Sequence, residues 1–385
     1  MAPKEGTLSI VLLGTQMEVA GSQRNLLAQA RWFHLQGHRV KAVFFYDKQG
    51  LHEKWQAESA FPVVSLNGWK SGSSGFRNYL RLGPALLRLF RLLRDDVDVI
   101  VAFTPHSNLL GLPLAWLAGV PGRIGSHRGY IEGSSKFMQR LHGRLTNSRL
   151  CGAMVAVSSQ VRENAIHEEG ARPERVVVIP NGIDPPAFKA GKRDATRTQL
   201  GVPESGLLLI TVGRLTIQKG HTYLLDAIAQ MAPRHPELRF AFAGEGPLRA
   251  ELEAKAQQLG ISKSILWLGI REDIGDLLSA ADVFVQPSLW EGLSRALLEA
   301  LFVGLPVLST NVEGVTDVVE DGKSALLIPA GDVPALAKAM ERMVGDAELR
   351  KRLARAGQEK AKAQHSLEGM CIAYEALMRK VLDAS

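Results

Sequence analysis

The chain has 385 residues, of which 46% are hydrophobic and 22% are charged. These proportions exclude collagen-like and intrinsically disordered proteins, and the length suits two domains with full cores. The net charge is +7, but residues 1–190 carry 23 basic and 14 acidic residues, whereas residues 191–385 carry 23 and 25. Two interpretations of the basic first half remain open: an anionic partner, or the ordinary basic surplus of many soluble enzymes.

Two apolar stretches raise the question of a targeting signal or a membrane span. The run Leu8–Leu13 is shorter than the apolar core of a signal peptide. Residues 99–122 contain no Asp, Glu, Lys or Arg, but three prolines and a Thr-Pro-His-Ser-Asn sequence interrupt them, so we expect a strand, a loop and a helix instead of a span. The distant Cys151 and Cys371 fit neither a disulfide framework nor a zinc site, which indicates a reducing, cytoplasmic location.

Short runs of Val, Ile, Leu and Ala alternate with helical stretches along the chain. Most runs are continuously apolar, which is typical of parallel strands that are buried on both faces and joined by helices. Two such series predict an α/β protein with two Rossmann-like, doubly wound domains. The expected strands are Leu8–Leu13, Arg39–Phe45, Val97–Phe103, Arg123–Ser126, Gly152–Val157, Arg175–Pro180, Leu207–Val212, Arg239–Ala243, Ile265–Leu268, Ala281–Val285, Pro306–Ser309 and Ala325–Ile328.

An Asn-Gly turn and a Pro-Pro pair within residues 179–186, followed by a polar stretch, mark the boundary between the domains. We predict an N-terminal domain of residues 1–188, a second domain of residues 189–365 and a C-terminal helix of residues 366–385. Ser366 can cap this helix, and its apolar face must pack on another element, for which we expect the N-terminal domain. That face consists of Met370, Tyr374, Leu377 and Val381.

Two loops after strands of the second domain suit phosphate groups, since ligands of doubly wound sheets bind at the carboxyl ends of the strands. Residues 213–220 are flanked by glycines and hold Arg214 and Lys219, a planar fork and a point charge. In the second loop, Gly292 permits close approach of a ligand, and the amides of Leu293 and Ser294 lie at a helix N-terminus, where unpaired N–H groups bind anions.

The same region offers groups for hydroxyls. Glu299 lies within an apolar helical run and needs a specific partner, and its carboxylate can accept two hydrogen bonds from a ribose diol. A third loop, residues 243–247, contains Gly244 and would crowd the same edge. No Gly-x-Gly-x-x-Gly follows a strand and no Walker A sequence occurs, which disfavours a nicotinamide dehydrogenase.

In this order, these segments resemble the retaining glycosyltransferases of family 4. The resemblance covers nearly the whole chain, is densest in the second half, and implies the GT-B fold: two Rossmann-like domains with a cleft between them. It rests on residues 213–220, 242–247, 267–269, 281–288 and 304–310 and on the pair Glu291 and Glu299.

The resemblance implies a role for each matching residue. Arg214 and Lys219 would hold the donor diphosphate, Glu299 the ribose hydroxyls, and the catalytic Glu291 the hydroxyls of the transferred sugar. Backbone amides would meet the phosphates, and the backbone around Ile270 the nucleobase. The full expected donor-binding set is Gly21, Arg214, Lys219, Gly244, Ile270, Arg271, Gly292, Leu293, Ser294 and Glu299.

The first half contributes two further expectations. Val-Ala-Gly-Ser-Gln-Arg at 19–24 resembles the family's Gly-Gly loop, with Gly21 kept and Ala20 replacing the first glycine. Ile-Gly-Ser-His-Arg at 124–128 resembles the strand end where the family places a catalytic histidine, which makes His127 the expected residue and His106 its alternative.

We expect neither a metal nor a cofactor. Asp96-Val-Asp98 matches the metal-binding Asp-x-Asp pattern of the other major glycosyltransferase fold, but it precedes a strand, away from the ligand edge. Basic side chains and helix dipoles can stabilise a leaving diphosphate instead.

Two basic, amphipathic helices are predicted at residues 77–94 and 136–149. They indicate either contact with an anionic membrane or lipid-linked acceptor, or ordinary helices with a solvated face. Nucleic acid is not expected, since no recognition motif accompanies the charge.

The sequence thus predicts a metal-independent, retaining glycosyltransferase that moves a hexosyl or N-acetylhexosaminyl group from an NDP-sugar (UDP first, GDP second) to a hydroxyl of a glycan or lipid-linked acceptor. It would be cytoplasmic, with peripheral contact at the inner face of the membrane. A sugar-nucleotide epimerase of the same fold and a non-catalytic sugar-nucleotide-binding protein remain open alternatives, although the Glu291 and Glu299 pair favours transfer.

Overall fold

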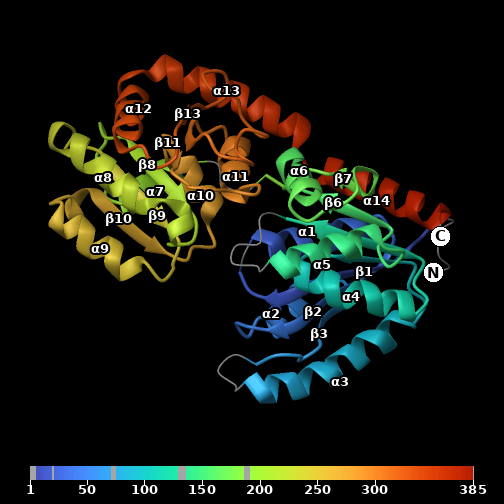
Figure 1. Cartoon of the computed structure of the whole chain (residues 1–385). Coiled ribbons are helices and arrows are strands. Elements are labelled where there is room, and N and C mark those ends of the chain that lie inside the picture. Colours follow the sequence, from blue (N-terminus) through green and yellow to red (C-terminus); the bar gives the residue numbers. More distant parts are fainter. Residues whose placement is uncertain (1–5, 20, 71–74, 129–135, 186–190, 385) are drawn as a thin grey trace. The chain divides into compact units, whose positions relative to one another are not determined.

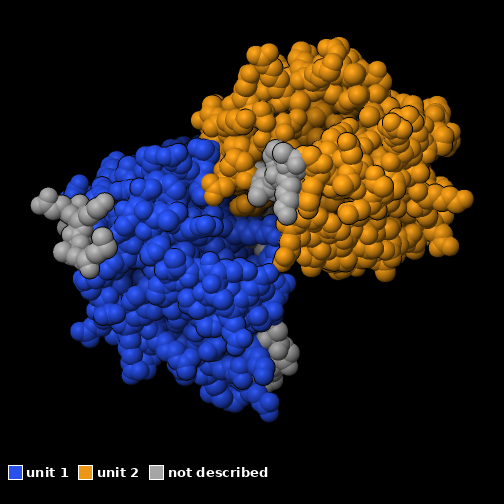
Figure 2. Space-filling model, turned by 180° about the vertical axis from the view of Figure 1, so that it is seen from behind, with its two compact units in different colours: residues 1–182, 366–385 blue, residues 183–365 orange. Residues whose placement is uncertain are grey.

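The computed structural model describes residues 6–19, 21–70, 75–128, 136–185 and 191–384 (Figure 1). It divides the chain into two compact units, drawn in different colours in Figure 2. Unit 1 comprises residues 1–182 and 366–385, and unit 2 comprises residues 183–365. Ala20 and the expected boundary at residues 188 and 189 lie outside the described residues.

Unit 1 contains a seven-stranded sheet in the order β3-β2-β1-β4-β5-β6-β7, and every strand pair is parallel. Six of these strands lie where the apolar runs predict them. The remaining one, β3, is a three-residue strand that follows Pro62, too short to give a recognisable pattern. The strands are β1 (Ser9–Met17), β2 (Arg39–Asp47), β3 (Val63–Ser65), β4 (Val99–Ala102), β5 (Gly122–His127), β6 (Ala153–Ala156) and β7 (Val176–Val178).

The helices of unit 1 cover both faces of this sheet, as right-handed crossovers between parallel strands require. On one face α3, α4 and α5 lie side by side in that order, and α1 packs beside α14 elsewhere on the sheet (Figure 1). The helices are α1 (Gly21–Leu35), α2 (His52–Glu58), α3 (Gly75–Leu93), α4 (Pro105–Leu117), α5 (Lys136–Asn147), α6 (Ser159–His167) and α14 (Leu367–Asp383).

Unit 2 contains a six-stranded parallel sheet in the order β10-β9-β8-β11-β12-β13. Two apolar clusters form its core, one beneath α8, α9 and α12 and the other beneath α10 and α11. The strands are β8 (Leu208–Val212), β9 (Arg239–Ala243), β10 (Ile265–Gly269), β11 (Val283–Gln286), β12 (Val307–Thr310) and β13 (Leu326–Ile328). The helices are α7 (Arg193–Gln199), α8 (His221–Met231), α9 (Arg249–Gln258), α10 (Ile274–Ala280), α11 (Arg295–Val303), α12 (Val333–Gly345) and α13 (Ala347–Gln364).

The C-terminal helix α14 belongs to unit 1. Ser366 caps it by accepting a hydrogen bond from the amide of Gly369 at 3.2 Å. The apolar face enters the same core cluster as the strands and α1, and the largest side chain of that face, Tyr374, is only 1% exposed. An element from the end of the sequence therefore completes the core of the first unit.

The uncharged stretch at residues 99–122 forms β4, α4 and the first residue of β5. Among the described residues, no helix combines the length and the apolar character needed to cross a bilayer.

Candidate active site

Three loops meet at the carboxyl edge of the sheet in unit 2, because β8 lies between β9 and β11. The amide of Leu215, in the loop after β8, donates to the carbonyl of Glu245 in the loop after β9 at 3.0 Å. On the other side, the amide of Leu289, after β11, donates to the carbonyl of Gln218 at 2.8 Å. The second bond fixes the two phosphate-type loops predicted from the sequence beside each other, and the first bond joins the third loop to them.

Two glycines allow these loops to approach so closely. Gly220 has φ +63° and Gly244 has φ +150°, values that residues with a side chain rarely adopt. A Cβ on Gly220 would collide with the carbonyl oxygen of Pro287, and one on Gly244 with the carbonyl oxygen of Gly213. The loops after β8, β9 and β11 are therefore in backbone contact at two points where no other residue fits.

Lys219 and Glu291 form an ion pair at the junction of the first and second loops. Their side chains are 19% and 6% exposed, and the hydroxyl of Ser288 donates a second hydrogen bond to the same carboxylate oxygen at 2.7 Å. The cation expected to hold phosphate and the carboxylate expected to hold the sugar thus neutralise each other within this structure.

Helix α11 presents its N-terminus to the same edge. Ser294 is the N-cap and accepts a hydrogen bond from the amide of Leu297 at 3.3 Å. Leu293 and Ser294 therefore lie at the positive end of the helix dipole, where an anion is stabilised. Glu299 is 5% exposed in the middle of this helix, and the partner that its burial requires is Arg295, whose Nε donates to Oε1 at 2.7 Å.

The other predicted donor residues of unit 2 lie at the same edge. Arg214 is exposed, and its side chain makes no hydrogen bond or ion pair to any described residue. Ile270 follows β10 and is 66% exposed, whereas Arg271 makes two hydrogen bonds to Asp273, at 2.7 and 2.6 Å. These bonds raise the pKa of Arg271.

His221, which the sequence does not single out, is the first residue of α8 and directly follows the loop of residues 213–220. Burial, reinforced by the charge of Lys219, lowers the pKa of His221 to about 3. Its imidazole is therefore neutral at physiological pH, so it adds no charge to the site.

In unit 1, Gly21 begins α1 and His127 ends β5, so both lie after or at the carboxyl ends of strands. His127 is 2% exposed, and its Nε2 donates to a carboxylate oxygen of Glu169 at 2.8 Å. Nδ1 of His127 is buried and has no hydrogen-bond partner among the described residues. The alternative, His106, is exposed in the first turn of α4.

A buried hydrogen-bond network next to His127 determines which ring nitrogen of His142 carries a proton. The amide of Asn108 is oriented by Ser126, whose carbonyl accepts from Nδ2 at 3.1 Å and whose N–H donates to Oδ1 at 3.4 Å. Nδ2 also donates to Nε2 of His142 at 2.9 Å, so His142 carries its proton on Nδ1 and donates it to Glu169 at 2.7 Å. One carboxylate therefore holds two imidazoles.

Burial raises the pKa of the Glu169 carboxyl, but the hydrogen bonds that His127 and His142 donate, together with the electrostatic attraction of these imidazoles, outweigh it and hold this pKa at about 2. These three side chains also form the group within the described part of the chain whose ligand atoms, all within 4.8 Å of one another, could hold a metal ion. Each carboxylate oxygen is already bonded to a different imidazole, which is a complete arrangement for an ionised glutamate.

The Asp-x-Asp sequence has structural partners. Asp98 accepts a hydrogen bond from the amide of Ser9 at 2.7 Å and so holds the start of β1 beside β4. Asp96 pairs with Arg39 at 2.6 Å on the surface. Both aspartates lie at the amino ends of the strands.

Both halves of the chain are similar to known protein families. The family described as Glycosyltransferase Family 4 matches residues 19–186, and the family described as Glycosyl transferases group 1 matches residues 192–360. A UDP-Gal:alpha-D-GlcNAc-diphosphoundecaprenol alpha-1,3-galactosyltransferase of Escherichia coli is 30% identical over 277 residues, which are 68% of this chain and 70% of that protein. The chain belongs to the family 4 glycosyltransferases.

Another relative and a solved structure are also similar to this chain. A 2-deoxystreptamine glucosyltransferase of Streptomyces kanamyceticus is 30% identical over 74% of this chain and 78% of its own length. The structure of Alr3699/HepE from Anabaena in complex with UDP superposes with a TM-score of 0.84 at 23% identity, over 97% of this chain and all of that one. The structural likeness confirms the predicted GT-B fold, with its two parallel-sheet α/β domains, and the sequence relatives confirm a glycosyltransferase.

Besides His221, the sequence does not single out Arg295 in unit 2 or Glu169 and His142 in unit 1. Arg295 has a sequence signal in retrospect, since a basic residue in the first turn of a helix opposes the helix dipole. Glu169 and His142 have none, because they reach His127 from an unrelated loop and helix.

The Glu169 network has a measurable consequence. The pKa of Glu169 lies below its unfolded value of 4.5, so its ionisation contributes stability above about pH 5 that is lost as pH falls toward about 2. We expect Glu169→Gln to lower the free energy of unfolding at pH 6 by about 2–3 kcal/mol, and this deficit to shrink toward pH 3. Urea titrations at several pH values measure both quantities.

The adjacent, exposed Glu168 provides the control, and Glu168→Gln should retain the pH dependence of the wild type. A deficit of Glu169→Gln that stayed constant between pH 6 and pH 3 would contradict the assigned ionisation.

Proposed function

We propose that this glycosyltransferase moves a hexosyl or N-acetylhexosaminyl group from an NDP-sugar to a hydroxyl of a glycan or lipid-linked acceptor, with retention of configuration and without a metal ion. The observation that carries the proposal is the placement of Lys219 and Glu291 in contact, beside the N-terminus of α11. UDP is preferred to GDP as the nucleotide, since HepE binds UDP and UDP-glucose.

In the proposed donor complex, Lys219 and Glu291 separate from each other and bind groups of the donor. The diphosphate takes Lys219, Arg214 and the amides of Leu293 and Ser294, which frees the carboxylate of Glu291 for hydroxyls of the sugar. The ribose hydroxyls bind Glu299, and the nucleobase lies against the backbone around Ile270. Lys219 exchanges one anionic partner for another, and the carboxylate of Glu291 exchanges its ion pair for hydroxyl donors, so neither buried group is left without a hydrogen-bond partner.

In the proposed reaction, the bond between the anomeric carbon and the diphosphate oxygen breaks, and the acceptor oxygen bonds to that carbon from the same face. The hydroxyl proton of the acceptor passes to the departing phosphate oxygen. Lys219 and Arg214 stabilise the negative charge on the leaving diphosphate, which removes the need for a cation such as Mg²⁺. We propose that Nδ1 of His127, which has no partner among the described residues, accepts a hydrogen bond from a hydroxyl of the substrate.

The proposed acceptor is presented by a membrane, because the Escherichia coli relative is named for a diphosphoundecaprenol acceptor. We propose that the enzyme is cytoplasmic and binds the inner face of the membrane peripherally. The surface that suits this contact is the outer side of α3 and α5. Neither these helices nor α4 between them contains an acidic residue.

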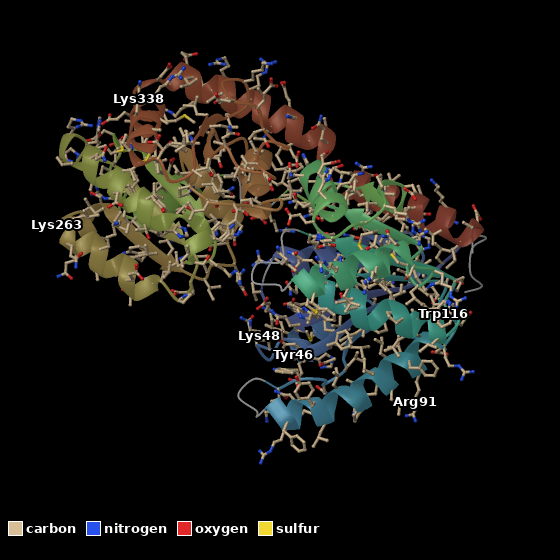
Figure 3. All side chains as sticks on the ribbon, viewed as in Figure 1. Tyr46, Lys48, Arg91, Trp116, Lys263 and Lys338 are labelled. Atoms are coloured by element: carbon tan, nitrogen blue, oxygen red, sulfur yellow. The ribbon has the colours of Figure 1, made fainter. Side chains whose placement is uncertain are left out.

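The outer side of α3 combines apolar and basic side chains. Phe76, Leu80 and Leu87 recur at helical spacing and are 74%, 62% and 48% exposed. Arg77 and Arg91 flank this stripe, and Arg91 is labelled where it projects from the helix in Figure 3. Such a surface buries apolar groups among lipids while its cations meet anionic headgroups.

Helix α5 repeats this pattern. Phe137 and Leu141 are 69% and 38% exposed, and Arg140 and Arg144 flank them on the same side of the helix. Two helices on the same face of the sheet, α3 and α5, thus share the chemistry of a membrane-binding surface.

The reaction is tested with a radiolabelled UDP-sugar and a short-chain polyprenyl diphosphate-linked N-acetylglucosamine. We expect UDP release that depends on the acceptor, a product with the anomeric configuration of the donor by NMR coupling constants, and unchanged rates in EDTA. A product of inverted configuration would refute retention, and loss of activity in EDTA would refute metal independence. Formation of an epimer without acceptor would refute glycosyl transfer.

The donor site is tested by calorimetry with UDP. Lys219→Ala and Glu299→Ala should each weaken UDP binding by about 2–3 kcal/mol, because each removes charge-assisted hydrogen bonds. Lys263→Ala is the control, since Lys263 (Figure 3) is an exposed lysine in the turn before β10, at the amino end of that strand. Equal UDP affinity in all variants would show that the donor binds elsewhere.

Membrane contact is tested by sedimentation of the full chain with lipid vesicles. We expect binding to vesicles rich in phosphatidylglycerol, weakened by salt, and little binding to phosphatidylcholine. Arg77→Glu with Arg91→Glu should reduce binding at least about tenfold, at roughly 1 kcal/mol for each basic charge.

The control double variant, Lys351→Glu with Arg355→Glu, makes the same change of charge on the exposed side of α13. An equal effect of both double variants would show that only net charge matters, and would refute the α3 surface.

A further inference from the structure

Arg295 occupies a position where a positive charge is unfavourable. It is the first residue of α11, directly after the N-cap Ser294, at the positive end of the helix dipole. Its partner Glu299 follows it by four residues, and this order, with the basic residue first, is the less favourable one for a pair on a helix. The helix alone therefore does not explain an arginine at this position.

The guanidinium of Arg295 is only partly satisfied. Nε donates to Glu299 at 2.7 Å, but Nη1 is buried and has no hydrogen-bond partner among the described residues. A buried donor without an acceptor costs free energy, and such groups mark positions that a ligand completes.

A second orphaned donor lies at the same helix terminus. Gln286, the last residue of β11, is 3% exposed, and its Oε1 accepts from the hydroxyl of the N-cap Ser294 at 2.6 Å. Nε2 of Gln286 is buried and, within the described part of the chain, has no partner. A strand and a helix thus each bring one buried, unpaired N–H group to the N-terminus of α11.

We propose that Arg295 is a donor-binding residue in its own right: Nε orients Glu299 for the ribose, and Nη1 donates to a phosphate oxygen of the nucleoside diphosphate. This inference rests on the proposed function and adds a phosphate ligand to it. An anion fits this position because a guanidinium, a helix dipole and the buried amide of Gln286 all present positive charge there. A bound phosphate also converts the unfavourable charge at the start of α11 into a favourable one.

The choice of ligand distinguishes two roles of Arg295: positioning Glu299 and binding a phosphate group. If Arg295 only positions Glu299, its loss weakens uridine and UDP by the same factor, because both carry the ribose. If Nη1 binds phosphate, its loss weakens UDP far more than uridine.

The experiment is a ligand-observed NMR titration of the full chain with uridine and with UDP. For Arg295→Met we expect UDP affinity to fall about 10- to 100-fold, as for the loss of a charge-assisted hydrogen bond, and uridine affinity to fall only about twofold. Arg295→Lys keeps the charge without the planar fork and should lie between the wild type and Arg295→Met for UDP.

Arg355→Met is the matched control. Arg355 also donates through Nε to a glutamate four residues later, Glu359, at 3.0 Å, but it lies on the exposed side of α13. This variant should bind both ligands as the wild type does. Thermal unfolding followed by circular dichroism identifies any variant that is not folded, and Arg295→Lys then carries the comparison.

Equal losses for uridine and UDP, or no loss for either, would overturn the assignment of Nη1 to phosphate. A folded wild type that binds neither ligand would instead refute the proposed donor, so the two failures are distinguishable.

Discussion

The parallel direction of every strand determines where chemistry is possible in this chain. A parallel strand must be followed by a connection that returns to the opposite end of the sheet, so all segments that follow strands begin at one edge. In unit 2 the helices α8 and α11 both start there, and their positive ends gather with the loops after β8 and β11. The edge is therefore electropositive before any side chain is considered, although unit 2 contains the less basic half of the sequence.

The side chains added to this edge are balanced instead of uniformly basic. Glu291 and Glu299 are both nearly buried, and each is paired with one cation, Lys219 and Arg295 respectively. Buried carboxylates without partners would destabilise the fold, so the pairs keep the site intact between turnovers. The same pairs impose a requirement on any ligand: it must offer negative charge to the cations and hydroxyl donors to the carboxylates together. A sugar nucleotide meets this requirement, whereas a free sugar or an inorganic anion meets only half of it.

Much of the fold could be predicted because continuous apolar runs are long enough to identify parallel strands. Strand β3 could not be predicted because its three residues give no periodicity. Its position in the sheet is set by pairing with β2. The residues proposed to bind the donor could be identified through motifs, but their side-chain partners could not. The ion pair of Lys219 with Glu291 joins residues 72 positions apart, and the link from Glu169 to His127 spans 42, distances at which a single sequence carries no pairing information.

Unit 1 is assembled from two separate stretches of the chain, and unit 2 interrupts them. The last stretch, α14, contributes fully buried side chains such as Met378 and Cys371 to a core that otherwise consists of residues before Gly182. During synthesis, the apolar surface of all seven strands of unit 1 therefore stays incompletely covered until unit 2 and α14 have been made. Unit 2, being continuous, can complete its own core first. We therefore expect unit 2 to fold before unit 1, the reverse of the order of translation. Unit 1 completes its core only when α14 packs on it.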